Sequence, residues 1–173
     1  MRREALDNLR QLYRARDETT KLYAVLQRLH ENSPNEAPIT ADLARLGLNL
    51  DENTESSHQL AKEAYDRAPN DVNCAVTYAF SLHRLGRNAD ALAIIHNLPP
   101  EALHDAHAAI YVALVLVEGS ELEGAKDYIK AAENAKLYLE EKKLLEEAKT
   151  KLSAASAIPS PTESPSPGAT PPL

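Results

Sequence analysis

The chain has 173 residues, of which 43% are hydrophobic and 26% are charged, with a net charge of −7, one cysteine and no tryptophan. This length suits one domain with or without a tail, and a single cysteine excludes an internal disulfide. The acidic balance argues against nucleic-acid binding, and five glycines leave little material for a phosphate-binding loop.

The first thirty residues are basic, with seven Arg or Lys against four Asp or Glu, whereas the remainder is acidic. Two interpretations stay open for this bias: a surface that orients a partner, or an ordinary solvated face. No apolar stretch of the signal-peptide kind follows Arg2 and Arg3. The longest apolar run, residues 108–117, is too short to cross a bilayer. We therefore expect a cytoplasmic protein without membrane insertion.

Helical periodicity runs through residues 1–152, and no stretch alternates as a strand does. Asn70 or Asp71 is placed to cap a helix, and Ser120 has the spacing of a capping-box residue. Gly86 and Gly119 follow apolar helices, where a left-handed residue is favoured. Prolines mark the other breaks, at Pro34, Pro38, Pro69, Pro99 and Pro100. These signals predict eight repeat helices and a ninth at the end.

Three copies of a helical-hairpin pattern place a large first-helix residue nine positions before a small or leucine residue of the second helix. The pairs are Tyr13 and Leu22, Leu82 and Ala91, and Leu116 and Ala125. A further copy fits less well. Leu46, Gly47 and Leu50 match the first helix, but Ser57 and Ala61 come two residues early. This offset indicates a shortened turn or a locally shifted helix.

The pattern resembles the tetratricopeptide repeat family, through Leu6-x2-Leu9-x3-Tyr13 and its counterparts in residues 3–137. The resemblance implies an all-α, right-handed α-solenoid of about four hairpins with a C-terminal capping helix. The repeats are expected at residues 3–36, 37–71, 72–104 and 105–137, and the capping helix at 138–152. No copy carries the family's first-helix tryptophan.

The predicted capping helix has one apolar stripe that includes Tyr138 and Leu145, and we expect its paired Glu140 and Glu141 to be solvated. The composition changes at Ser153, because residues 153–173 hold six of the eleven prolines and one charge. This segment is predicted to be a disordered tail or linker, either an inert spacer or a substrate of a proline-directed kinase.

First helices of this family line a concave groove, which the resemblance makes the expected site of a protein or peptide partner. Its residues are predicted one or two places from the core anchors: Asn73, Val76, Thr77, Phe80, Arg84, His107, Ile110, Tyr111 and Leu114. In the first copy the corresponding positions are Asp7, Asn8, Gln11 and Arg14, so one end of the groove is expected to be polar. An exposed apolar patch at Phe80 and Tyr111 is typical of a contact site. The alternative is that both rings pack against the neighbouring first helix.

No catalytic motif is found, and we expect neither a cofactor nor a metal. His104, Asp105 and His107 have spacing that suits zinc, but no third histidine or cysteine is near in sequence. The sequence therefore predicts a non-catalytic protein-interaction scaffold. A regulatory or assembly domain of a larger enzyme, a client-holding chaperone, and self-association through the first repeat remain alternatives.

Overall fold

The structure is a computed structural model that describes residues 2–100, 103 and 106–156. Within these residues the chain is all-α, as predicted, and forms nine helices without a strand. The helices are α1 (Arg3–Ala15), α2 (Thr19–Asn32), α3 (Ala37–Leu50), α4 (Thr54–Arg67), α5 (Val72–Arg84), α6 (Asn88–His96), α7 (Ala106–Glu118), α8 (Leu122–Glu133) and α9 (Leu139–Ser156). None of them is both long and apolar enough to cross a membrane.

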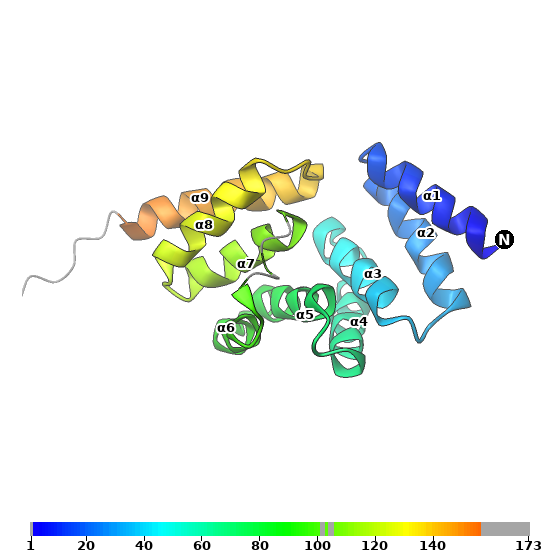
Figure 1. The fold of residues 1–173 in the computed structure, drawn as a ribbon, viewed down its shortest axis with the longest axis horizontal. Coiled ribbons are helices and arrows are strands. Elements are labelled where there is room, and N and C mark those ends of the chain that lie inside the picture. The colour runs from blue at the N-terminus through cyan, green and yellow to red at the C-terminus, as the bar shows by residue number, and fades with distance from the viewer. Residues whose placement is uncertain (1, 101–102, 104–105, 157–173) are drawn as a thin grey trace, which may run out of the picture.

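The first eight helices form four successive hairpins, and α9 packs against α7 and α8 at the end of the array (Figure 1). Each hairpin turn has three residues between its helices, and the first helices begin 34, 35 and 34 residues apart. Neighbouring hairpins bury apolar faces that a single hairpin would leave open, which is why such repeats stack. The expected solenoid is thus confirmed.

The second repeat has a turn of ordinary length, so the predicted shortened turn is wrong. The sequence offset arises because α3 contains one residue more than the other first helices. Counted from the helix starts, the counterpart of Leu9 is Leu43 and not Leu46. Gly47 takes the place of Tyr13 and of its equivalents in the other repeats. A Cβ atom on Gly47 would lie 2.2 Å from Ser57 Oγ, so this glycine allows α3 and α4 to approach closely.

Helix ends follow the predicted chemistry only in part. The Asp71 side chain accepts from the Cys74 backbone N–H at 2.9 Å, as expected of an N-cap, and Gly86 is left-handed with φ of 73°. Gly119 is not left-handed. The turn instead places Ser120 at φ of 62°, so Ser120 does not cap α8.

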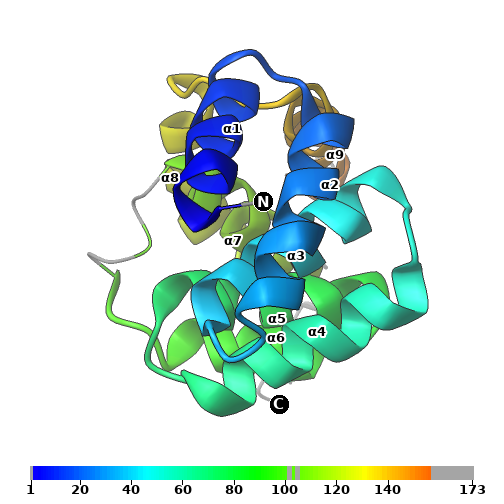
Figure 2. The ribbon, with the colours of Figure 1, turned by 90° about the vertical axis from the view of Figure 1, so that its right-hand side faces the viewer.

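The buried apolar residues form a large cluster, mainly of α5–α9 with Leu48 of α3, and a smaller one of α1–α3. A third, minor cluster contains Ala37, Ala41, Ala64 and Cys74. One residue from the C-terminal part, Tyr138, belongs to the smaller cluster. In the end-on view of Figure 2, the connection between α8 and α9 passes beside the α1–α2 hairpin. The two ends of the array therefore meet across its concave side.

Helix α9 continues to Ser156, four residues beyond the predicted end of the capping helix. The predicted tail otherwise lies outside the described residues.

Candidate partner-binding groove

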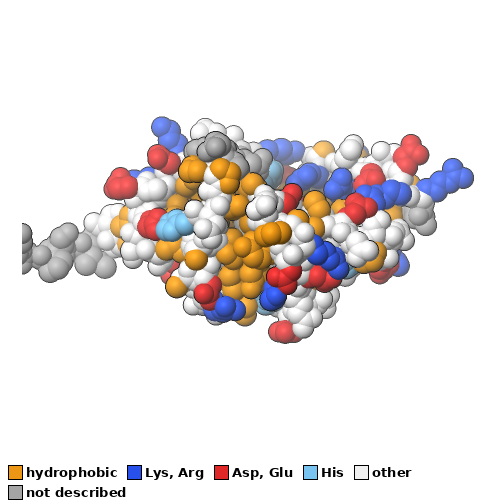
Figure 3. All heavy atoms as spheres, turned by 60° about the horizontal axis from the view of Figure 1, so that its bottom comes forward, with side chains coloured by type: hydrophobic (Ala, Val, Ile, Leu, Met, Phe, Trp, Pro, Cys, Tyr) orange, Lys and Arg blue, Asp and Glu red, His pale blue; other side chains and the backbone are white. Residues whose placement is uncertain are grey.

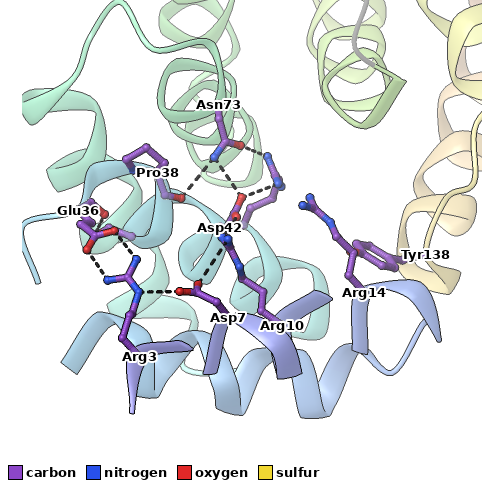
Figure 4. Close-up of polar contacts among 11 residues, drawn as sticks. Arg3, Asp7, Arg10, Arg14, Glu36, Pro38, Asp42, Asn73 and Tyr138 are labelled. Atoms are coloured by element: carbon purple, nitrogen blue, oxygen red, sulfur yellow. Dashed lines mark hydrogen bonds and ion pairs between the residues drawn. The ribbon is translucent and has the colours of Figure 1, made fainter. Parts of the chain in front are cut away.

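Helices α1 and α3 present a row of polar side chains to the concave side of the array. Arg10 and Arg14 lie four residues apart on α1, and Asp42 and Arg45 lie three apart on α3, so each pair shares one face of its helix. Figure 4 shows Arg10, Arg14 and Asp42 turned toward the space between these helices and Asn73. A hollow of about 330 Å³, which we call the concave hollow, is lined by Arg14, Asp42, Arg45, Val72, Asn73, His107 and Ala108.

The arginines of this row differ in how firmly they are held. Arg45 donates to Asp42 at 2.9 Å and to Asn73, and its guanidinium carbon lies 5.6 Å from the centre of the Tyr111 ring. Burial by itself lowers the pKa of Arg45, but nearby negative charge, chiefly Asp42, outweighs it and raises the pKa. Arg10 lies 4.0 Å from Asp42, a loose ion pair. Arg14 is the most exposed of the three.

The concave side is closed at the next two hairpins. Tyr111 of α7 reaches past α5 and accepts from Asn49 Nδ2 of α3 at 2.7 Å. The Phe80 ring lies beneath it, with ring centres 4.7 Å apart and planes tilted by 56°. The curvature of the array thus brings α3 and α7 together over α5, and the apolar part of the groove becomes core.

The nine predicted groove residues therefore divide into two groups. Asn73 and His107 line the concave hollow, and Arg84 is exposed and forms an ion pair with Asp51. The other six are fully buried: Val76, Thr77, Phe80, Ile110, Tyr111 and Leu114. The expected exposed patch at Phe80 and Tyr111 is wrong. The alternative, packing between first helices, is what the structure shows.

Glu141 is fully buried at the centre of this closure, so the expectation that it is solvated is also wrong. Its carboxylate accepts from His107 Nδ1 at 3.0 Å, from the Tyr111 hydroxyl at 3.1 Å and from the Tyr138 backbone N–H at 3.0 Å. Burial raises the pKa of Glu141, but these hydrogen bonds and the charges of His107 and Arg45 lower it below its ordinary value.

The phenols around Glu141 stay neutral. Burial is the largest cause that raises the pKa of Tyr111, to well above 10, and the negative charge of Glu141 adds to it. Burial likewise raises the pKa of Tyr138, against the lowering effect of Arg14, whose Nε donates to the Tyr138 hydroxyl at 3.0 Å. Together these residues form a polar network that joins α1, α3, α7 and α9.

Sequence reasoning missed Arg10, Arg45 and Asp42 as groove residues. The signal was present, because Asp42, Arg45 and Asn49 form a polar stripe on the otherwise apolar α3. The sequence pattern placed Leu46 and Gly47 three residues out of register with the first repeat. The structural correspondence between positions of α1 and α3 was therefore not apparent.

A second hollow of about 330 Å³ lies between α4, α5 and α6. It is lined by Tyr65, Pro69, Asn70, Ala75, Ile94, Asn97, Leu98 and Pro99. Figure 3 shows a face of the molecule with hydrophobic side chains gathered near its middle. This lining contains no charged side chain, so the second hollow lacks the electrostatic character of the concave hollow.

Within the described part of the chain, no group of three or more His, Cys, Asp or Glu side chains is placed to hold a metal ion. Of the spacing that suited zinc, His104 and Asp105 lie outside the described residues, and His107 contacts Glu141.

The fold is similar to a solved structure described as the MamA RS-1 ArsTM double mutant. The two share 15% sequence identity at a TM-score of 0.52, over 88% of this chain and 93% of that chain. MamA contains tetratricopeptide repeats, so the likeness shows a tetratricopeptide-like helical repeat fold. No family model matches the chain, and no curated protein sequence matches it.

Proposed function

We propose that this chain is a non-catalytic protein-interaction scaffold, which binds an acidic segment of a partner protein in the concave hollow. The observation that carries the proposal is a cationic site on an acidic protein. The net charge is −7, yet the row on α1 and α3 has three arginines against Asp42 and Asp7, the latter 3.6 Å from Arg10. Such a local reversal of sign attracts an oppositely charged partner segment and helps to orient it.

The chemistry of the hollow suits carboxylates in particular. Arg14 extends into it from α1, and its guanidinium offers a planar set of donors that matches a carboxylate. Asn73 and His107 add polar groups from α5 and α7. Arg45 is already held by Asp42 and Asn73, so it supplies positive charge to the hollow and keeps its present hydrogen bonds.

The test compares Arg14→Glu with Arg16→Glu, which changes another exposed arginine, immediately after the same helix and outside the lining of the hollow. Protein partners are captured from a lysate of the source organism and identified by mass spectrometry. The strongest one is then purified and titrated. We expect Arg14→Glu to weaken binding at least about tenfold, the size of a lost charge-assisted contact, and Arg16→Glu to leave it unchanged.

Binding should also weaken as salt is raised from 50 to 500 mM, because exposed charges are screened. Equal affinity of parent and Arg14→Glu for every captured partner would contradict the proposal. It would move the site to another face of the array. Loss of binding in both variants would likewise argue against a role specific to the hollow.

A further inference from the structure

The connection between α8 and α9 occupies part of the groove that a partner would use. Residues 134–138, which we call the α8–α9 loop, are not helical and cross to the first hairpin. Lys136 Nζ donates to the Ala15 carbonyl at 2.7 Å, and the Thr19 hydroxyl donates to Glu140 at 3.3 Å just after the loop. A short segment, non-helical up to Tyr138, therefore contacts the first hairpin on the concave side.

Tyr138 seats this segment in a pocket of the first two hairpins. Its ring joins the apolar cluster of α1–α3, and its hydroxyl accepts from Arg14. The space left beside it is about 20 Å³, room for about one water molecule. This space is lined by Arg10, Arg14, Leu22, Leu26, Asp42, Arg45, Leu46, Asn49, Tyr138 and Glu141. The pocket is thus apolar at its base and cationic at its rim, and one aromatic side chain almost fills it.

The charges of the segment complement those of the pocket. Apart from the segment's own Glu141, the charged lining residues are three arginines and Asp42. The segment follows Tyr138 with Leu139, Glu140 and Glu141. Glu141 lines the pocket together with the three arginines, and Glu140 accepts from the Thr19 hydroxyl of the first hairpin. A tyrosine followed by acidic residues is therefore the chemistry that this pocket accepts.

The contacts between the segment and the first hairpin are all made by side chains of the segment, and the packing of α9 does not depend on them. Leu137, Leu145 and Ala148 belong to the large cluster. Tyr138, by contrast, belongs to the smaller cluster of α1–α3. To leave the pocket, the segment must also release the contacts of Glu141 with His107 and Tyr111 and the packing of Leu137 in the large cluster. The later part of α9, with Leu145 and Ala148, then stays packed on α7 and α8.

We propose that residues 136–141 are a built-in ligand of the α1–α3 pocket, and that a partner segment with a tyrosine followed by acidic residues displaces them. The inference rests on the proposed function and names the chemical class of the partner. Binding to the free chain is then weakened by the fraction of molecules whose pocket is already filled. A partner must compete with a tethered segment, whose effective concentration is high.

The test is fluorescence anisotropy of a labelled, end-blocked peptide of residues 134–142, Asn-Ala-Lys-Leu-Tyr-Leu-Glu-Glu-Lys. It is titrated with the parent chain, with Tyr138→Ala, and with Leu139→Ala as the matched control, because Leu139 is adjacent and 61% exposed. We expect Tyr138→Ala to bind at least about tenfold more tightly than the parent, and Leu139→Ala to match the parent. Replacing the tyrosine of the peptide by alanine should abolish binding.

Equal affinity of the parent and Tyr138→Ala would overturn the proposal, and so would undiminished binding of the alanine peptide. If circular dichroism shows that Tyr138→Ala has lost its helical structure, the proposal is tested instead on the parent chain. Spin labels at the exposed positions 11 and 136 report the distance between α1 and the α8–α9 loop, and the buried Cys74 remains unlabelled. Excess peptide should add a population of longer distances. An unchanged distribution would refute displacement.

The two proposals fail separately. If a partner requires Arg14 but the peptide binds neither the parent nor the variants, the proposed function is supported and the built-in-ligand proposal is rejected. If the peptide binds Tyr138→Ala but no captured partner requires Arg14, the pocket's preference for this segment is supported and the proposed function is rejected.

Discussion

Gly47 is the residue at which the second repeat departs from the other three. It occupies the position of Tyr13, Leu82 and Leu116, where those repeats carry a large side chain. Ser57 Oγ and Tyr23 Cε2 would lie 2.2 and 3.2 Å from a Cβ atom there. The glycine therefore serves packing between helices, and its φ is not positive. A glycine that allows two helices to approach closely does not contribute to the hydrophobic periodicity of its helix. The sequence pattern therefore predicted the wrong register for α3.

We expect Gly47→Ala to lower the free energy of unfolding by about 1–3 kcal/mol, because overpacking exceeds the gain of about 1 kcal/mol in helix propensity. Gly124→Ala is the matched control, since its Cβ atom would lie 3.6 Å from Leu116 Cδ1, an ordinary contact. Urea denaturation measures both. The double change with Ser57→Ala should recover part of the loss. A Gly47→Ala protein as stable as Gly124→Ala would show that the two helices separate freely.

The lowered pKa of Glu141 makes stability depend on pH. Its ionised form stabilises the fold above the ordinary value of 4.5, and this contribution is lost as the pH falls below 4.5 through the lowered folded-state pKa. At pH 7, Glu141→Gln should cost about 1–3 kcal/mol, because a buried charge-assisted network is weakened. The difference from the parent should shrink in acid. A denaturation series from pH 7 to pH 3 checks this, with the exposed Glu146→Gln as control, and a constant difference would contradict the assignment.

The two ends of helix α9 have different packing roles. Its N-terminal residues close the concave side through Glu141, while Leu145 and Ala148 cover the last repeat. Its amphipathic pattern predicted the second role, because a stripe of apolar residues reports which face of a helix is buried. The first role depends on which distant helix meets the start of α9, and the pattern along α9 itself contains no information on that.

Leu145→Ala should lower the free energy of unfolding by about 2–5 kcal/mol, since Leu145 is buried in the large cluster and the change leaves a cavity. Leu139→Ala, on the same helix but exposed, should change stability by less than about 0.5 kcal/mol. Thermal or urea unfolding of the two variants distinguishes them. Equal effects would mean that α9 does not cover the last repeat as described.

At the scale of the whole molecule, stability is expected to be uneven along the array. The hairpins of α5–α8 share the large cluster, whereas α1–α2 forms an end of the array with the smaller cluster. Terminal repeats have one neighbour in place of two, and their local opening costs less free energy.

Hydrogen–deuterium exchange read by mass spectrometry should therefore show amides of α1 and α2 exchanging before those of α5 and α7. Segment-by-segment rates under conditions that favour folding provide the measurement. Uniform exchange of all hairpins would instead indicate that the array opens as one cooperative unit.

The sequence by itself determined the helices, their grouping into hairpins and the ends at Asp71 and Gly86. These depend on interactions between residues a few positions apart, which periodicity and cap chemistry report directly. The tertiary structure alone decided that Phe80 and Tyr111 are core, that Glu141 is buried, and that Asp42 and Arg45 of α3 join Arg14 around the open hollow. The reason is the curvature of the array, because contacts such as that between Asn49 and Tyr111 join helices that no local pattern relates.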